Sequence, residues 1–245
     1  MVVTTETVDI EAGGTPMRML VTQPRAEGRY PAIVMYSDIF QITGAQRRLS
    51  TRLAGYGFVV ATPEIYHRIE PAGTALEFDD AGRARGLEDA RKTSVAELDA
   101  DCRSALDYLA AHPRASGRRM GAMGFCIGGH LAFRAALQPD VRATACFYPT
   151  GLSDGKLGKD ADAGSLGRAA EIKGELLLVF GTADPHVPDD ARAKIAETLT
   201  RAETTFATRL FAAEHAFMRD EGPRYDPEAT DRAWDEAITF LRRTL

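Results

Sequence analysis

The chain has 245 residues, 44% of them apolar, which is enough for one α/β domain with a sizeable core. Its formal net charge of −5 argues against nucleic acids and anionic membranes as partners, since both attract a basic surface. The first residues lack the pattern of a signal peptide, no apolar run is long enough to span a bilayer, and three widely spaced cysteines do not suggest a disulfide framework, so we expect a cytoplasmic protein.

In chain order, short apolar strands alternate with amphipathic helices. The sequence predicts an antiparallel pair at 3–12 and 16–24, followed by buried strands at 32–37, 57–63, 119–125, 143–148, 175–181 and 205–211. Helices are predicted at 45–53, at 95–109, after residue 126 and from Asp226-Pro227 onward. The alternation predicts a doubly wound, mostly parallel sheet with helices on both faces, in a single domain over 1–245. Ligands bind such sheets beyond the carboxyl ends of the strands.

Two long connections depart from this alternation. Residues 64–90 form a polar segment, and residues 150–172 are rich in glycine and aspartate. Connections of this length inside a compact domain are usually functional lids or disordered. Because both follow predicted strand ends, we expect either of them to overhang a binding site.

The segment Gly124-Phe125-Cys126-Ile127-Gly128 lies where a predicted strand gives way to a predicted helix. With serine at its centre, this pattern is the nucleophile elbow, a tight turn that exposes the nucleophile at a helix N-terminus. There the helix dipole and the free N–H groups stabilise a thiolate and an oxyanion. The alternative is that Cys126 is a buried filler, which is our interpretation of Cys102 and Cys146.

A nucleophile of this kind needs a base and an acid that orients the base, in the chain order nucleophile, acid, histidine. Asp184 follows the predicted strand 175–181, and His215 follows the strand 205–211. All three side chains are therefore expected at one edge of the sheet. His186, beside Asp184, is a weaker candidate for the base. The spacing of the histidines fits no metal site, so we expect neither a metal nor a cofactor.

At these residues the chain resembles the dienelactone hydrolase family, a branch of the α/β-hydrolase fold with a cysteine nucleophile. The matching stretches are YSDIFQ (36–41), PEIYHR (63–68), GFCIGG (124–129), GTADPHVP (181–188) and EHAFMR (214–219). The resemblance implies that Cys126 is the nucleophile, His215 the general base and acid, and Asp184 the residue that orients His215.

The resemblance implies further roles for residues around this triad. The backbone N–H groups of Ile39 and Ile127 match the oxyanion hole of the family. Asp38 stands where the family usually has a glutamate that contacts the resting cysteine, and it is one methylene shorter. Arg219 matches an arginine that pairs with that acid or with a substrate carboxylate. The alternatives are that Asp38 caps the following segment and that Arg219 is a solvated surface residue.

We therefore expect a hydrolase that cleaves a small ester or lactone, with a carboxylate on the substrate if Arg219 faces the pocket. The expected mechanism is Cys-His-Asp catalysis through a thioester acyl-enzyme. One alternative is a broader carboxylesterase or thioesterase with the same triad, and another is a binding protein that senses oxidants or electrophiles through a reactive thiol. The sequence is compatible with a monomer or a small homo-oligomer.

Overall fold

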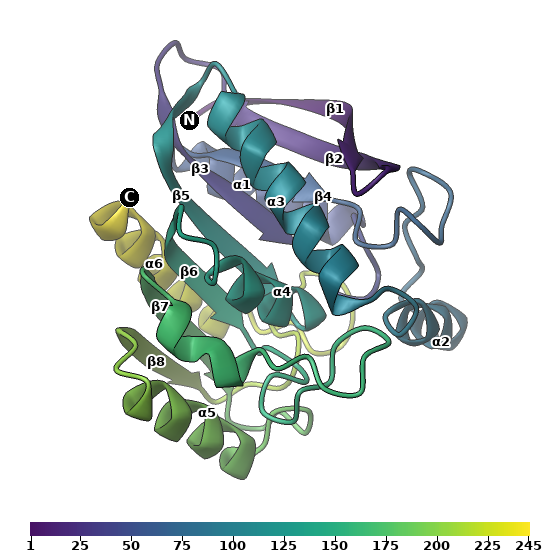
Figure 1. Cartoon of the computed structure of the whole chain (residues 1–245), viewed down its shortest axis with the longest axis vertical. Coiled ribbons are helices and arrows are strands. Elements are labelled where there is room, and N and C mark those ends of the chain that lie inside the picture. The colour runs from purple at the N-terminus through teal and green to yellow at the C-terminus, as the bar shows by residue number, and fades with distance from the viewer.

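An eight-stranded mixed sheet forms the centre of the structure, a computed structural model that describes residues 1–245 with the exception of the Arg118 side chain (Figure 1). The strands lie in the order β1-β2-β4-β3-β5-β6-β7-β8. Their bounds are β1 Val3–Ala12, β2 Thr15–Pro24, β3 Tyr30–Tyr36, β4 Val59–Pro63, β5 Ala115–Phe125, β6 Val141–Phe147, β7 Glu175–Gly181 and β8 Phe206–Phe211. The β1–β2 and β2–β4 pairs are antiparallel and all other neighbours are parallel. The predicted α/β-hydrolase architecture is therefore confirmed.

Every predicted strand is present, and most of the differences lie at strand ends. Strand β7 has the predicted bounds, whereas β5 begins at Ala115, four residues before the predicted start at 119. Strand β4 begins at Val59 because Gly57, which was predicted to open it, has a φ of 99° in the preceding turn. Only glycine adopts that conformation readily, so Gly57 belongs to the turn and not to the strand.

Helices cover both faces of the sheet. Their bounds are α1 Gly44–Gly55, α2 Asp80–Asp89, α3 Val95–Ala111, α4 Ile127–Ala135, α5 Asp189–Arg201 and α6 Pro227–Thr244, with a short 3₁₀ helix η1 at Leu166–Glu171. One apolar core lies between the sheet and α3, α4 and α5, and a second lies between the sheet and α1 and α6. Figure 1 shows α3 and α4 in front of the sheet and α6 behind it.

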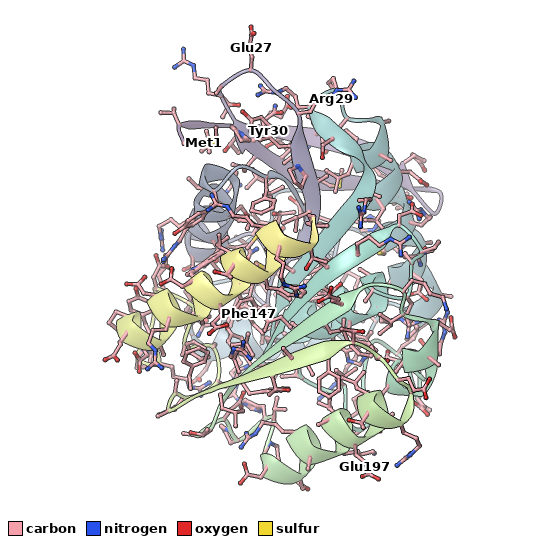
Figure 2. All side chains as sticks on the ribbon, turned by 90° about the vertical axis from the view of Figure 1, so that its left-hand side faces the viewer. Met1, Glu27, Arg29, Tyr30, Phe147 and Glu197 are labelled. Carbon is pink, nitrogen blue, oxygen red and sulfur yellow. The ribbon has the colours of Figure 1, made fainter. Side chains whose placement is uncertain are left out.

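The strands supply both cores because their side chains alternate between the faces. In β3, Val34 belongs to the first core, whereas Ile33 and Met35 belong to the second. Figure 2 shows Phe147 in the interior of the molecule and Glu197 at the outer surface of α5. The ends of the central strands are thus held rigidly by two packed layers, which positions whatever they carry. Among the described residues, none of the helices combines the length and apolar composition needed to span a bilayer.

Helix α2 lies within residues 64–90, which the sequence analysis described only as a long polar connection. Asp79 caps it by accepting a hydrogen bond from the Gly82 N–H at 2.7 Å. The Tyr66 hydroxyl donates to the Gly86 carbonyl at 3.0 Å. Most of the helix is exposed and its buried positions are two glycines and Asp89, so its sequence carries no apolar stripe. The helix depends on capping and on these tertiary contacts, which is why periodicity did not reveal it.

Candidate active site

Cys126 lies on a strained turn between β5 and α4. Its backbone has φ 59° and ψ −122°, a conformation that non-glycine residues rarely adopt. A Cβ at Gly124 would lie 1.9 Å from the Gly128 carbonyl oxygen, and a Cβ at Gly128 would lie 2.3 Å from that of Ser37. Both glycines are therefore required for the turn to close. The half-buried Cys126 side chain lines the large pocket described below.

His215 and Asp184 form a hydrogen-bonded pair at the same edge of the sheet. Asp184 follows β7, His215 follows β8, and His215 Nδ1 donates to Asp184 Oδ2 at 2.7 Å. The other carboxylate oxygen accepts from the His186 N–H at 2.7 Å. The His215 ring also packs edge-on against the rings of Tyr148 and His186, with centroids 4.9 and 4.7 Å away. The ring orientation is thus fixed by one hydrogen bond and two aromatic contacts.

The electrostatics of this pair favour charge separation. Burial opposes protonation of His215, but the negative charge of the facing Cys126 and the hydrogen bond with Asp184 raise its pKa to about 9. Burial likewise disfavours the Asp184 carboxylate, yet the hydrogen bond from His215 lowers the pKa of Asp184 below its usual range. At neutral pH the site therefore holds an imidazolium between a carboxylate and a sulfur.

Two backbone N–H groups next to Cys126 are free to bind an oxyanion. Ile39 lies in the turn after β3, and Ile127 is the first residue of α4, where an N–H has no partner within the helix. Across the described residues, neither N–H donates a hydrogen bond, and both residues line the pocket. They are the two residues that the resemblance singled out, and their role as an oxyanion hole stays a prediction.

Asp38 and Arg219 contact each other. Arg219 Nη1 donates to Asp38 Oδ2 at 3.1 Å, and the Phe40 N–H donates to Asp38 Oδ1 at 2.9 Å. Burial raises the pKa of Asp38, which the Arg219 charge partly offsets. Both oxygens of Asp38 thus bind groups other than Cys126. The contact with Phe40 resembles the predicted cap, but the pairing with Arg219 is a second role.

The Arg219 guanidinium is not a solvated surface group. It lies over the rings of Phe40 and Phe78, at 5.1 and 4.4 Å from their centroids, and its side chain is only 16% exposed. Phe78 lies in the connection 64–90, where no sequence signal distinguished it. The arginine faces the pocket with its charge partly balanced by Asp38.

The pocket has a volume of about 700 Å³ and lies over the carboxyl ends of the central strands. Cys126, His215, Ile39, Ile127, Asp38 and Arg219 all line it, and Asp184 lies behind His215. Its outer walls come from α2 and from residues 150–160, so both long connections overhang the site as expected. The described residues contain no group of three or more His, Cys, Asp or Glu side chains able to hold a metal ion.

Thr150 and Arg83 of the pocket wall also escaped the sequence analysis. Thr150 follows β6 and places its hydroxyl oxygen 3.7 Å from Cys126 Sγ. Its position just beyond a predicted strand end was the available signal. Arg83 projects from α2 and makes no ion pair within the described part of the chain. Because α2 itself was not predicted, nothing in the sequence singled out Arg83.

The remaining histidines differ in their surroundings. His130 is buried in α4, and its role is considered below. His67 contacts the Pro16 carbonyl and the Asp101 carboxylate, and it does not line the pocket. His186 does line the pocket, but its ring packs edge-on against His215 and is not bonded to Asp184 Oδ2. The geometry thus favours His215 over His186 as the partner of Asp184.

Sequence comparison identifies the family and several relatives of this chain. The model of the dienelactone hydrolase family matches residues 17–245. A Saccharomyces cerevisiae protein whose name assigns it provisionally to the carboxymethylenebutenolidases is 37% identical, over 90% of this chain and 84% of its own length. A carboxymethylenebutenolidase of Pseudomonas sp. strain P51 is 29% identical, over 98% of this chain and 95% of its own.

Solved structures share the fold. A provisionally assigned dienelactone hydrolase from Klebsiella pneumoniae superposes with a TM-score of 0.84 at 22% identity, over 98% of this chain and 99% of that one. A dienelactone hydrolase-like promiscuous phosphotriesterase from metagenomic libraries gives a TM-score of 0.79 at 21% identity, over 100% of this chain and 99% of that one. At these identities the likeness concerns the architecture.

Proposed function

Since this chain belongs to the dienelactone hydrolase family and is a hydrolase of esters or lactones, we propose that Cys126, His215 and Asp184 carry out the reaction through a thioester intermediate. One observation carries the proposal. Among the described cysteines, Cys126 alone lies on a strained turn at a helix N-terminus, and it shares a pocket with a histidine that is hydrogen-bonded to a buried carboxylate. A filler cysteine would require neither the backbone strain nor the histidine–aspartate pair.

In the acylation step, the Cys126 thiolate attacks the carbonyl carbon of the substrate and a C–S bond forms. The carbonyl oxygen becomes an oxyanion, which accepts hydrogen bonds from the Ile39 and Ile127 N–H groups. As the tetrahedral intermediate collapses, the C–O bond breaks and the His215 imidazolium gives its proton to the leaving alkoxide. The raised pKa of His215, about 9, keeps this proton available at neutral pH.

In the deacylation step, neutral His215 accepts a proton from water, and the resulting hydroxide attacks the thioester carbonyl. The C–S bond then breaks, the acid product leaves, and the thiolate and imidazolium are restored. Asp184 stabilises the imidazolium and holds His215 Nδ1 protonated, so that Nε2 faces the sulfur. In this mechanism His215 carries the proton in both steps.

For the substrate, we propose a small lactone or ester that carries a carboxylate, as the names of the relatives suggest. Arg219 lines the pocket, and the exposed Arg83 adds a second positive charge to its wall. A guanidinium binds a carboxylate through charge-assisted hydrogen bonds. A broader carboxylesterase is the second candidate, because the Arg219 charge is already partly offset by Asp38 at 3.1 Å.

The test compares Cys126→Ala with Cys146→Ala, which removes a buried thiol in the neighbouring strand. Each protein receives p-nitrophenyl acetate and a cyclic enol-lactone acid, and product release is followed. We expect Cys126→Ala to lose at least about a thousandfold in kcat/KM and Cys146→Ala to retain activity. Normal turnover by Cys126→Ala would refute the mechanism. A preference for the acidic lactone that weakens with salt supports the carboxylate-bearing substrate, whereas equal turnover of both compounds supports the broader esterase.

A further inference from the structure

We propose that Thr150 is a further catalytic residue, whose hydroxyl donates a hydrogen bond to the Cys126 thiolate, and that a buried polar chain behind it holds the hydroxyl in place. The inference rests on the proposed role of Cys126. Its starting point is the distance of 3.7 Å between Thr150 Oγ1 and Cys126 Sγ, which is within hydrogen-bond range for sulfur. A thiolate can only accept, so the hydroxyl must be the donor in the charged state.

The surroundings of the sulfur leave this role open to Thr150. Asp38 binds Arg219 and the Phe40 N–H, so it does not serve the sulfur. The Tyr66 hydroxyl donates its proton in a hydrogen bond to the Gly86 carbonyl at 3.0 Å. Burial raises the pKa of Tyr148 well above its usual value, so this residue is neutral and adds no charge beside Cys126. His215 is the charged group on the sulfur. Thr150 therefore adds a neutral donor to the cation already present.

Thr150 is fixed to the elbow at its backbone. Its N–H donates to the Cys126 carbonyl at 3.2 Å, so the two residues that face each other through their side chains are also joined through their main chains. Its own carbonyl lies 3.2 Å from His130 Nδ1. Because a carbonyl only accepts, His130 must carry its proton on Nδ1.

The donor and the acceptor in each of the other hydrogen bonds behind Thr150 follow from that tautomer. Burial lowers the pKa of His130 to about 4, so the ring is neutral and its Nε2 is an acceptor. Ser165 Oγ, at 2.7 Å, must then donate to Nε2. The same oxygen accepts from Arg134 Nη1 at 2.8 Å. Every hydrogen bond thus runs in one direction, from Arg134 through Ser165 and His130 to the Thr150 carbonyl.

An ion pair holds Arg134, the residue of this hydrogen-bonded series that lies farthest from Thr150. Arg134 is 4% exposed and donates to the two carboxylate oxygens of Asp99 on α3, at 2.7 and 2.6 Å. It also donates to the Ala163 carbonyl at 2.9 Å. Helix α3, helix α4 and the segment 163–165 are therefore tied together behind Thr150. We assign His130, Ser165 and Arg134 as positioning residues, since none of them touches the sulfur.

The experiment measures alkylation of Cys126 by iodoacetamide as a function of pH in four proteins: wild type, Thr150→Val, Thr150→Ser and Thr200→Val. Valine keeps the shape of threonine and removes the hydroxyl, whereas serine keeps the hydroxyl. Thr200 is exposed on α5, where its hydroxyl bonds the Ala196 carbonyl, and it does not line the pocket, so Thr200→Val is the matched control. Cys126→Ala provides the background from the other two cysteines.

We expect the midpoint of the alkylation profile to move up by about one pH unit in Thr150→Val, with kcat/KM for p-nitrophenyl acetate falling about tenfold below that midpoint. Thr200→Val should match the wild type, and Thr150→Ser should lie closer to the wild type than Thr150→Val because it keeps the hydroxyl. An unchanged profile in Thr150→Val, or a Thr150→Ser profile as shifted as that of Thr150→Val, would overturn the proposal. Alkylation needs no turnover, so a failure here is distinct from a failure of the proposed triad.

The positioning role has its own readout. In Ser165→Ala, His130 loses the donor to Nε2, and the Thr150 carbonyl is held less firmly. We expect kcat to fall severalfold with KM unchanged, because the substrate pocket itself is not altered. A shift in melting temperature with no change in kcat would reduce the chain to a stabilising element and remove the second half of the proposal.

Discussion

Cys126 directly follows β5, Cys146 lies in the neighbouring strand β6, and the difference between them indicates what would make a thiol reactive in this fold. Cys146 is fully buried inside β6 and pairs in register with Gly124 of β5. Gly124 precedes Cys126 by two residues. Cys126 lies just beyond the end of β5 with φ 59°, half-buried at the start of α4. Burial raises the pKa of Cys146, whereas Cys126 faces a histidine. The residue type is the same, so the place of each cysteine in the fold makes the difference.

The largest expected effect is on alkylation, which tests the comparison directly. In native protein at pH 8, we expect iodoacetamide to modify Cys126 at least about a thousandfold faster than Cys102 or Cys146, since burial raises the pKa of Cys102 to about 12 and leaves little thiolate. Peptide mapping by mass spectrometry over a time course measures the three rates. Comparable labelling of Cys146 in the folded protein would break the comparison.

The next effect separates the backbone contribution from that of the histidine pair. Asp184→Asn removes the charge that stabilises His215 and leaves the Cys126 turn intact, so kcat/KM should fall about a thousandfold while the enzyme still folds. Stopped-flow hydrolysis of p-nitrophenyl acetate gives the rate, and circular dichroism checks the fold. Activity within a few fold of the wild type would mean that the turn alone activates the thiol.

The turn itself is tested at Gly124, the residue opposite Cys146. A Cβ there would lie 1.9 Å from the Gly128 carbonyl oxygen, so Gly124→Ala should destabilise the protein by about 3 kcal/mol or more. A Cβ added at Gly167, in η1, would have no neighbouring atom within 4 Å, so Gly167→Ala should change stability by less than about 0.5 kcal/mol. Urea denaturation measures both. Equal, small effects would show that the elbow tolerates a side chain.

The smallest effect concerns pH. The folded-state pKa of His215 is raised to about 9, so its proton is present at neutral pH and is lost as the pH rises through that value. Because the acylation step uses this proton, kcat/KM should fall about tenfold for each pH unit above about 9. A profile recorded in constant-ionic-strength buffers tests this. In Cys126→Ser, which lacks a thiolate to raise the histidine pKa, any residual activity should lose this alkaline limb.

The sequence predicted the architecture and brought Cys126, Asp184 and His215 forward as candidates for one site because both predictions depend on local signals. Apolar runs of strand length mark the buried strands, and glycines around Cys126 mark a turn that no other residue permits. Asp184 and His215 each follow a predicted strand. Because the carboxyl ends of these strands meet at one edge of the sheet, both residues were expected there beside Cys126. Strand ends such as Ala115 were less well predicted, since pairing with a neighbouring strand extends them.

Other features were decided only by the tertiary structure. The Asp38–Arg219 pair joins positions 181 residues apart, and the hydrogen bonds from Arg134 to Thr150 join α4 to two loop segments. Helix α2 has no apolar stripe and exists through its cap and its contacts with neighbouring loops. Periodicity reports which face of an element is buried. It carries no information on which polar groups meet once the elements have packed, and here those meetings complete the surroundings of Cys126.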